Sequence, residues 1–249
     1  MIKPIIEVNN LTASYGPDTI VLENISFSVN KGEVFVILGE SGCGKSTLLR
    51  HLLALEKPTK GIVKINDARI DSDQNLFNQL YSRIGVLFQG GALFGSMSLA
   101  ENVALPLKTY TRLNKAIIDD IVRMKLRMVN LEGYENHLPS ELSGGMQKRA
   151  GIARALAMSP PMLFLDEPSA GLDPVTAAEL DDLIVSFNKN LGMTIVVVTH
   201  DLGSILKVGQ RCIMLDKKTK SIIAEGNPKV LKKTSTTPIV HNFFNRQVL

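Results

Sequence analysis

Cysteine is scarce in this sequence, with Cys43 and Cys212 the two examples among 249 residues. Two cysteines so far apart in a chain of this length form neither a disulfide framework nor a metal-binding spacing. A chain of this size buries enough surface to fold without cross-links. We therefore expect a reducing, cytosolic environment and exclude the class of small disulfide-rich secreted domains.

Long hydrophobic runs are also missing. The longest stretch without a charged residue is 84–100, and glycines and polar side chains interrupt it repeatedly, which makes it a poor membrane span. At the N-terminus, Glu7 arrives before the apolar core of a secretory signal can form. Internal repeats and low-complexity tracts are absent. We expect that a protein of this kind working at a membrane needs a partner to anchor it.

The composition is that of an ordinary globular protein. Hydrophobic residues make up 45% and charged residues 21%, which excludes disordered and fibrous classes. The length allows one large domain or two small ones. The net charge of +4, with a pI near 9.0, is too weak by itself to indicate nucleic-acid binding.

Three continuous apolar runs, 34–38, 162–165 and 195–198, are typical of strands covered on both faces. Helical stretches separate these runs, so we predict a doubly wound α/β core that binds its ligands at the carboxyl ends of the strands. Ahead of this core, residues 5–8 and the alternating apolar residues of 22–29 predict strands joined by short turns.

Between about 90 and 160 the pattern becomes helical. Apolar residues recur at helical spacing from Leu113 to Val129. Lys115, Arg123, Lys125 and Arg127 fall largely between them, and we interpret these basic residues as a solvated helix face, since no aromatic residues interleave with them. The segment is predicted to be a helical insertion in the α/β core, with no role in binding nucleic acid.

A phosphate-binding loop follows the run 34–38 directly and precedes a probable helix start. Its residues are Gly39, Glu40, Ser41, Gly42, Cys43, Gly44, Lys45, Ser46 and Thr47. This is the P-loop pattern in its required strand, loop and helix context. The glycines let backbone N–H groups turn toward phosphate oxygens, Lys45 reaches the β- and γ-phosphates, and the Ser46 hydroxyl ligates Mg²⁺. An ordinary glycine-rich turn is the alternative.

Two acidic residues close the run 162–165. An acid at the end of a buried strand is costly unless a cation accompanies it, so Asp166 is a candidate Mg²⁺ ligand, directly or through water. Glu167, one residue further, is placed to orient or deprotonate an attacking water. A plain helix N-cap is the alternative reading of this pair, and the P-loop disfavours it.

A second anion-binding helix start is predicted inside the insertion. Ser143 is a natural N-cap, and Gly144 and Gly145 leave backbone N–H groups open to an anion. The simpler reading is an ordinary capped helix.

Five motifs, 39–47, 142–147, 165–168, 169–173 and 199–201, follow in this order along nearly the whole chain. Together they resemble the nucleotide-binding subunit of an ABC transporter. The resemblance implies an α/β P-loop ATPase fold with an N-terminal antiparallel β subdomain and a helical insertion. It also implies ATP and Mg²⁺ as ligands and a dimer in which two copies of the chain enclose the nucleotide.

The resemblance assigns roles to single residues. It implies that Tyr15 stacks on adenine, that Gln89 senses Mg²⁺ and the attacking water, that His200 contacts the γ-phosphate and that Asp173 lies at the dimer interface. One position departs from the family pattern, because Met146 stands where glutamine is usual. The serine and glycines that meet phosphate are intact, so we expect nucleotide binding to survive.

A subfamily is indicated by further segments. Residues 87–94, 101–107, 142–146 and 172–178 are similar to the ATPases of MCE-type, Mla-like phospholipid transport systems. This resemblance implies a peripheral subunit on the cytoplasmic face of the inner (plasma) membrane. Its partners would be a membrane permease, an MCE-domain protein and a STAS-domain protein.

We place the ATP-binding domain at 1–236 and a C-terminal extension at 237–249. Apolar residues follow a basic segment in this tail. Docking on its own domain is the favoured interpretation, and contact with a neighbouring ATPase, which the resemblance implies, is the second.

Three other functions compete with lipid transport. An ABC-type ATPase acting on chromosomes would carry a long coiled coil between the P-loop and Ser143, and no heptad run occurs there. A P-loop kinase would leave residues 143–147 without a purpose. An ABC ATPase serving another cargo, such as an amino acid or other small solute, remains open.

Overall fold

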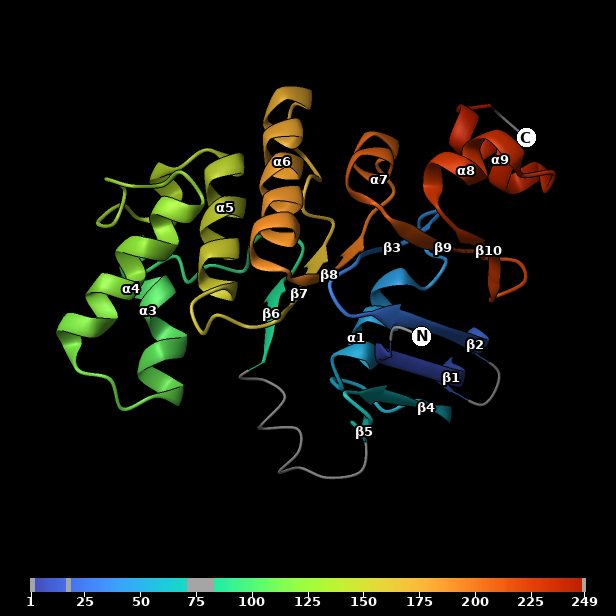
Figure 1. Ribbon diagram of the computed structural model, residues 1–249, viewed down its shortest axis with the longest axis horizontal. Coiled ribbons are helices and arrows are strands. Elements are labelled where there is room, and N and C mark those ends of the chain that lie inside the picture. Colours follow the sequence, from blue (N-terminus) through green and yellow to red (C-terminus); the bar gives the residue numbers. More distant parts are fainter. Residues whose placement is uncertain (1–2, 17–18, 71–82, 248–249) are drawn as a thin grey trace.

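The computed structural model describes residues 3–16, 19–70 and 83–247 (Figure 1). The strands are β1 (Pro4–Ser14), β2 (Ile20–Asn30), β3 (Val34–Gly39), β4 (Lys60–Ile65), β5 (Ala68–Arg69), β6 (Ile84–Leu87), β7 (Met162–Asp166), β8 (Thr194–Val198), β9 (Arg211–Leu215) and β10 (Ile222–Gly226). The helices are α1 (Lys45–Leu52), α3 (Leu99–Tyr110), α4 (Lys115–Met128), the 3₁₀ turn η1 (Pro139–Glu141), α5 (Gly144–Ala155), α6 (Pro174–Leu191), α7 (Leu202–Val208), α8 (Pro228–Thr234) and α9 (Pro238–Asn245).

The strands form two sheets. The smaller sheet has the order β2-β1-β4-β5 and is antiparallel throughout. The larger has the order β10-β9-β3-β8-β7-β6, parallel except for the outer strand β10. This confirms the predicted α/β core with an antiparallel N-terminal subdomain. Every residue of β3, β7 and β8 is buried, which is why these strands appear in the sequence as unbroken apolar runs.

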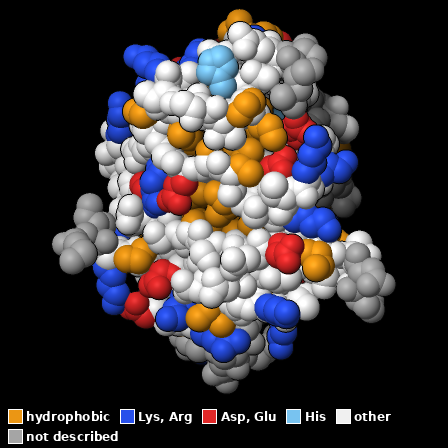
Figure 2. Space-filling view, turned by 90° about the vertical axis from the view of Figure 1, so that its right-hand side faces the viewer, with side chains coloured by type: hydrophobic (Ala, Val, Ile, Leu, Met, Phe, Trp, Pro, Cys, Tyr) orange, Lys and Arg blue, Asp and Glu red, His pale blue; other side chains and the backbone are white. Residues whose placement is uncertain are grey.

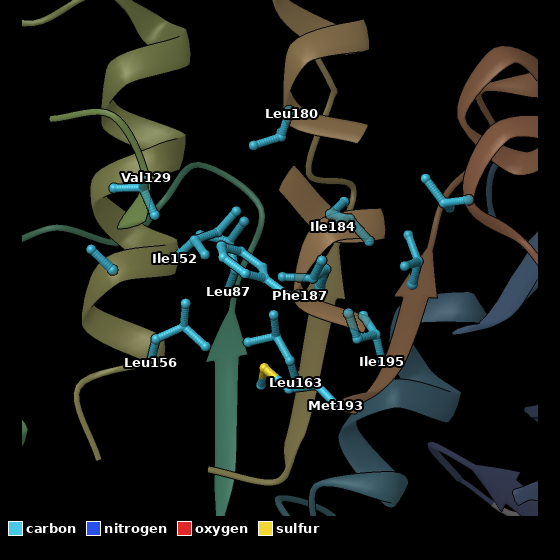
Figure 3. Packing of buried hydrophobic residues seen from close by; sticks show 14 of the residues in the cluster. Leu87, Val129, Ile152, Leu156, Leu163, Leu180, Ile184, Phe187, Met193 and Ile195 are labelled. Carbon is cyan, nitrogen blue, oxygen red and sulfur yellow. The ribbon is translucent and has the colours of Figure 1, made fainter. Parts of the chain in front are cut away.

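Helices α3, α4 and α5 lie together at one end of the larger sheet (Figure 1). Their apolar side chains join the core that covers one face of that sheet. Figure 3 shows Ile152 of α5, and Leu156 directly after that helix, close to Leu87 of β6 and Leu163 of β7, with Phe187 of α6 beside them. This shared core fixes where α5 stands relative to the strand ends.

One expectation about the helical segment is wrong. Lys125 of α4 is not part of a solvated face, because it is 6% exposed and its Nζ donates a hydrogen bond to the Ser159 hydroxyl at 2.9 Å. Burial lowers the pKa of Lys125. The α4 helix packs against α3 and α5, and the Lys125 stem is long enough to be covered while its ammonium meets a hydroxyl.

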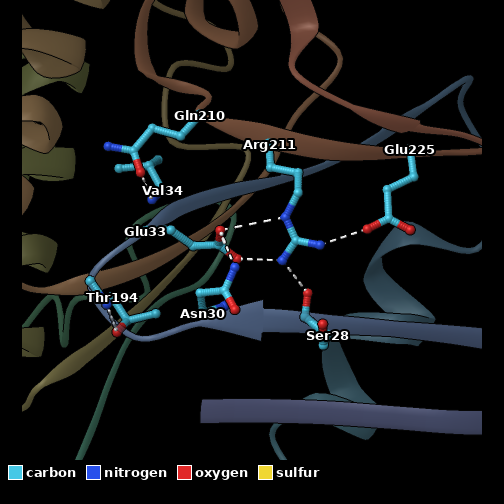
Figure 4. A network of polar contacts seen from close by, with 9 residues as sticks. Ser28, Asn30, Glu33, Val34, Thr194, Gln210, Arg211 and Glu225 are labelled. Carbon is cyan, nitrogen blue, oxygen red and sulfur yellow. Dashed lines mark hydrogen bonds and ion pairs between the residues drawn. The ribbon is translucent and has the colours of Figure 1, made fainter. Parts of the chain in front are cut away.

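A polar network ties the two sheets together (Figure 4). Arg211 of β9 forms ion pairs with Glu33 at 2.7 Å and Glu225 at 2.6 Å, and it donates to the Ser28 carbonyl of β2 at 2.5 Å. Its guanidinium also lies 5.0 Å from the ring centre of Phe35. The turn between β2 and β3 is thereby held against β9, at the start of the strand that leads to the phosphate-binding loop.

The C-terminal helices α8 and α9 lie at the opposite end of the larger sheet from α3 and α4 (Figure 1). Val240 and Phe244 of α9 are fully buried among core residues of the same chain. Figure 2 looks at this end of the molecule and shows hydrophobic side chains reaching its surface between charged ones. In the described ranges, none of the helices combines the length and the apolar character needed to cross a membrane.

Candidate functional site

Four of the segments singled out in the sequence follow the carboxyl ends of four parallel strands. Strand β3 runs into the glycine-rich loop, β6 leads to Gln89, β7 ends at Asp166 and β8 leads to His200. Because β3, β8, β7 and β6 are successive neighbours, these ends meet along one edge of the sheet.

A pocket of about 360 Å³ lies at this edge. Its lining residues are Val21, Ser41, Gly42, Gly44, Lys45, Ser46, Thr47, Gln89, Glu167 and His200. The fold thus brings the phosphate-binding loop together with Gln89, Glu167 and His200, which are far apart in the sequence. The volume is within the range of small-molecule sites.

Close packing against neighbouring strands explains two glycines of the loop. Gly39 has a φ of +147°, and a Cβ there would lie 2.4 Å from the carbonyl oxygen of Leu215. Gly44 has a φ of +98°, and a Cβ there would lie 2.7 Å from Cδ2 of Leu22. A side chain at either position would force the loop away from the neighbouring strands.

Lys45 lies inside the loop at the start of α1. The residue is 8% exposed, and its Nζ donates to the carbonyl oxygens of Gly39 at 2.8 Å and Glu40 at 2.9 Å. Two of the three ammonium donors are therefore satisfied by the loop itself. Ser46, the next residue, lines the pocket.

Asp166 ends β7 as a buried acid. It is 7% exposed, and its Oδ1 atom is buried with no hydrogen-bond partner among the described residues. Burial raises the pKa of Asp166, and the charge of Glu167 raises it further. A divalent cation would satisfy such an orphaned carboxylate oxygen, so the residues at this edge fit a Mg²⁺ ion.

Glu167 has an unusual backbone conformation. Its φ is +46°, in the left-handed region that non-glycine residues rarely adopt. Its N–H donates to the Val198 carbonyl at 2.8 Å, and its Oε1 lies 2.7 Å from Nδ1 of His200. These contacts to Val198 of β8 and to His200, two residues beyond it, hold Glu167 at the edge of the pocket.

Metal binding would depend on a bound nucleotide. In the parts of the chain that the structure describes, no three His, Cys, Asp or Glu side chains gather into a metal site. Mg²⁺ held here would take oxygen ligands from phosphate, and Ser46, Gln89 and Asp166 remain the candidate protein ligands.

Other residues singled out in the sequence lie outside this pocket. Tyr15 is 59% exposed, and its hydroxyl lies 3.1 Å from Oγ1 of Thr47. The Ser143 hydroxyl caps α5 by accepting from the Met146 N–H at 3.3 Å. Ser143, Gly144 and Gly145 do not line the pocket in their own chain. Within the loop, Cys43 is buried in the core, and burial raises the pKa of its thiol.

Asp173 caps a different helix. Its Oδ1 accepts from the N–H groups of Val175 at 3.0 Å and Thr176 at 3.1 Å at the start of α6. Hydrogen bonding from the Thr176 side chain, together with these backbone N–H groups, lowers the pKa of the Asp173 carboxyl. The residue therefore fixes the end of the loop that begins after Glu167.

A second pocket of about 510 Å³ shares Glu167 and His200 with the first. Asp181 of α6 lines it, is 4% exposed and accepts a hydrogen bond from the Ser204 hydroxyl at 3.0 Å. Burial raises the pKa of Asp181 to about 6. Asp181 could not be found from the sequence, because an acid within a helix carries no motif.

Lys148 of α5 is a second residue beside the site that could not be found from the sequence. It is 7% exposed and donates to the Glu167 carbonyl at 3.5 Å. Burial lowers the pKa of Lys148, while the nearby carboxylates of Asp166 and Glu167 act in the opposite direction. The residues next to Lys148 in the sequence are polar, and they do not indicate that it is buried.

Comparison with known proteins identifies the family. The family described as "ABC transporter" matches residues 22–170. The chain is 42% identical over 241 residues to the probable ribonucleotide transport ATP-binding protein mkl of Mycobacterium tuberculosis, covering 96% of this chain and 66% of that protein. It is 38% identical over 243 residues to the intermembrane phospholipid transport system ATP-binding protein MlaF of Haemophilus influenzae, covering 96% of this chain and 90% of that protein.

Solved structures show the same likeness. The dimeric post-hydrolysis state of the ATP-binding cassette MJ0796, bound to ADP and Pi, superposes with a TM-score of 0.81 at 33% identity, covering 89% of this chain and 98% of that one. The chain thus spans about two thirds of the mkl relative and nearly all of a solved cassette. Because the matched residues run from β2 to the loop that follows Glu167, this chain belongs to the ABC transporter family as an ATPase domain.

Proposed function

We propose that this protein is the ATP-hydrolysing subunit of a membrane ABC transporter that moves phospholipid within the cell envelope. The observation that carries the ATPase part is the single pocket that joins the P-loop to Gln89, Glu167 and His200. Similarity to MlaF supports the lipid cargo, as do residues 87–94 and 101–107. Mkl, named for ribonucleotide transport, supports the second candidate, transport of a small solute.

The pocket residues and their neighbours divide the work of hydrolysis. Lys45 and the loop N–H groups bind the phosphates of ATP, and Tyr15 supports the adenine. Ser46, Gln89 and Asp166 would hold Mg²⁺, which neutralises charge on the phosphates when bound. Glu167 takes a proton from the water whose oxygen attacks the γ-phosphorus, and ADP leaves as the bond to the β-phosphate oxygen breaks. His200 Nδ1 already lies 2.7 Å from Oε1 of Glu167, and we assign that proton to Oε2.

Two copies are needed to complete each site. The P-loop leaves the outer side of the γ-phosphate open, and the N-terminus of α5 lies outside the pocket of its own chain. A second copy would supply Ser143, Gly144 and Gly145 as the missing donors, with Asp173 at the interface. The dimeric cassette structure supports this arrangement. ATP then joins the copies, and hydrolysis releases them.

An apolar groove beside Gln89 suits the permease. It measures about 350 Å³ and is lined mainly by apolar side chains from the end of α1, β6, α3 and the end of α5. Phe88 is 39% exposed, Tyr110 66% and Leu55 48%, so apolar surface is available here to a helix of a membrane partner. We propose that the ATPase lies on the cytoplasmic face of the inner membrane, where its net charge of +4 would suit the anionic surface. An MCE-domain protein and a STAS-domain protein would complete the system.

Glu167→Gln tests the ATPase assignment. The amide cannot accept the proton, so we expect ATP turnover to fall by about 10²- to 10⁴-fold while ATP binding is retained. Steady-state phosphate release and nucleotide binding measured on the same preparation decide the outcome. Turnover within a few-fold of the unmodified chain would remove Glu167 from this role.

Purification in mild detergent tests the cargo. We expect a tagged chain to retain a membrane permease, and mass spectrometry of the extracted complex to find phospholipid bound to it. Recovery with a binding protein for a small polar solute, and no enriched lipid, would replace the lipid assignment with the second candidate.

A further inference from the structure

Helix α5 packs closely against the segments at the catalytic edge of the sheet. Gly151 makes this approach possible, because a Cβ there would lie 2.6 Å from Cδ1 of Leu87 and 3.1 Å from the Gly91 carbonyl oxygen. Arg154 donates to the carbonyls of Gly91 at 3.1 Å and Ala92 at 2.8 Å, just after Gln89. The helix that begins at Ser143 therefore holds the backbone beside one catalytic residue.

Lys148 of α5 makes a corresponding contact to the backbone of the second catalytic residue, Glu167. Its ammonium donates to the Glu167 carbonyl at 3.5 Å, and within the described ranges it has neither another hydrogen bond nor an ion pair. A lysine that is 7% exposed with one carbonyl partner is expensive to bury. The negative charges of Asp166 and Glu167 offset part of that cost.

The contact falls where the backbone needs support. Glu167 adopts a positive φ of 46°, a conformation that costs a non-glycine residue about 1–3 kcal/mol and persists only when its surroundings hold it. Its N–H is fixed by the Val198 carbonyl at 2.8 Å, and its carbonyl accepts from the Ala170 N–H at 3.2 Å. Lys148 is the side chain that adds to this hold, and it comes from the helical segment.

We propose that Lys148 is a positioning residue that links the position of α5 to the Glu167 backbone, and thereby sets the aim of the Glu167 carboxylate. The inference rests on the proposed role of Glu167 as general base. When Ser143 of α5 meets the nucleotide held by the second copy, any shift of α5 moves the Lys148 ammonium relative to the Glu167 carbonyl. Binding of the second copy thus changes the position of the Glu167 carboxylate through the Lys148 side chain.

Lys148→Met, which keeps the length of the stem and removes the charge and the donors, tests the proposal in steady-state ATP hydrolysis by the full-length chain. We expect kcat to fall about 10- to 10²-fold, the effect of a misplaced catalytic group, with KM for ATP changed less than about twofold. Lys148→Arg, which keeps a buried cation and donors, should recover most of kcat.

Lys125→Met is the matched control. Lys125 is also a buried lysine of the helical segment, 6% exposed and hydrogen-bonded to Ser159, but it has no contact with Glu167. We expect its kcat to equal that of the unmodified chain. Thermal unfolding of each variant checks folding, and Lys148→Gln replaces Lys148→Met in the same comparison if the methionine variant does not fold.

A double variant separates this inference from the proposed function. If Lys148 acts through Glu167, then Glu167→Gln combined with Lys148→Met should turn over at the rate of Glu167→Gln alone, within about twofold. A folded Lys148→Met variant with unchanged kcat, or a double variant slowed by the full factor again, overturns the role of Lys148 while Glu167 stands. Unchanged turnover in Glu167→Gln itself would overturn the general base instead.

Discussion

The buried carboxyl of Asp181 makes stability depend on pH. Burial raises the pKa of Asp181 to about 6, whereas in the unfolded chain it is about 4. Between these values the folded state holds the extra proton, so this residue lowers the free energy of unfolding as pH rises from about 4 to about 6. Asp181→Asn keeps an oxygen for the Ser204 hydroxyl and should be more stable than the unmodified chain by about 1–3 kcal/mol at neutral pH, and equal near pH 4. Urea unfolding at both pH values measures this.

Asp182→Asn provides the comparison for that experiment. The Asp182 side chain is 71% exposed and pairs with Lys207 at 2.8 Å, and an exposed pair contributes little to stability. We expect a change of less than about 0.5 kcal/mol at both pH values. Destabilisation of Asp181→Asn at neutral pH would show that its carboxylate is compensated by groups other than Ser204.

Single functional residues could be predicted from the sequence where they directly follow a buried strand. Asp166 and Glu167 stand directly after a buried run, and the P-loop precedes a helix, so their positions follow from the parallel sheet. Asp181 and Lys148 could not be found this way. Their burial depends on groups 23 and 19 positions away, Ser204 and Glu167, which only the packing of α5, α6 and α7 brings near.

Among the helices, α9 is attached by two buried side chains. Val240 and Phe244 are fully buried, and the ring of Phe244 meets that of Phe243 edge-on with centroids 5.4 Å apart. Phe244→Ala should lower the free energy of unfolding by about 3–5 kcal/mol, or release α9 at a smaller cost. Phe243→Ala, at a half-buried position, should cost less. Denaturant unfolding, with hydrogen exchange of α9 amides, distinguishes a global loss from local release, and equal losses for both variants would contradict the assigned packing.

Element boundaries could be predicted where the chain carries its own signal. Helix α4 begins after Asn114, whose side chain accepts from the Ile117 N–H at 3.0 Å, and the apolar spacing of 113–129 had placed a helix there. The short strands β5 and β10 gave no such signal. Strand β5 has two residues, and both strands exist because they pair with β4 and β9. The long strand β1 was foreseen over a few residues, since register shifts interrupt its alternation.

For the whole molecule, the open question is whether ATP joins two copies through α5. In the Glu167→Gln background, where ATP persists, we expect the chain to be a dimer with ATP and a monomer with ADP. Adding Ser143→Arg should keep it monomeric with ATP, because the long side chain occupies the space in front of the α5 N-terminus that a phosphate of the partner would need. Sedimentation velocity at matched concentrations measures the change.

The ATP affinity of the single chain is the control for this experiment. Ser143 does not line the pocket of its own chain, so the arginine should leave the affinity of a single chain for ATP within about fivefold of the parent, or about 1 kcal/mol. Removing residues 238–249 supplies the contrast, because α9 packs on its own domain and its loss should leave the ATP-dependent dimer in place. A dimer that survives Ser143→Arg and disappears with the C-terminal residues would assign the joining surface to α9, and each nucleotide site would then be complete within one chain.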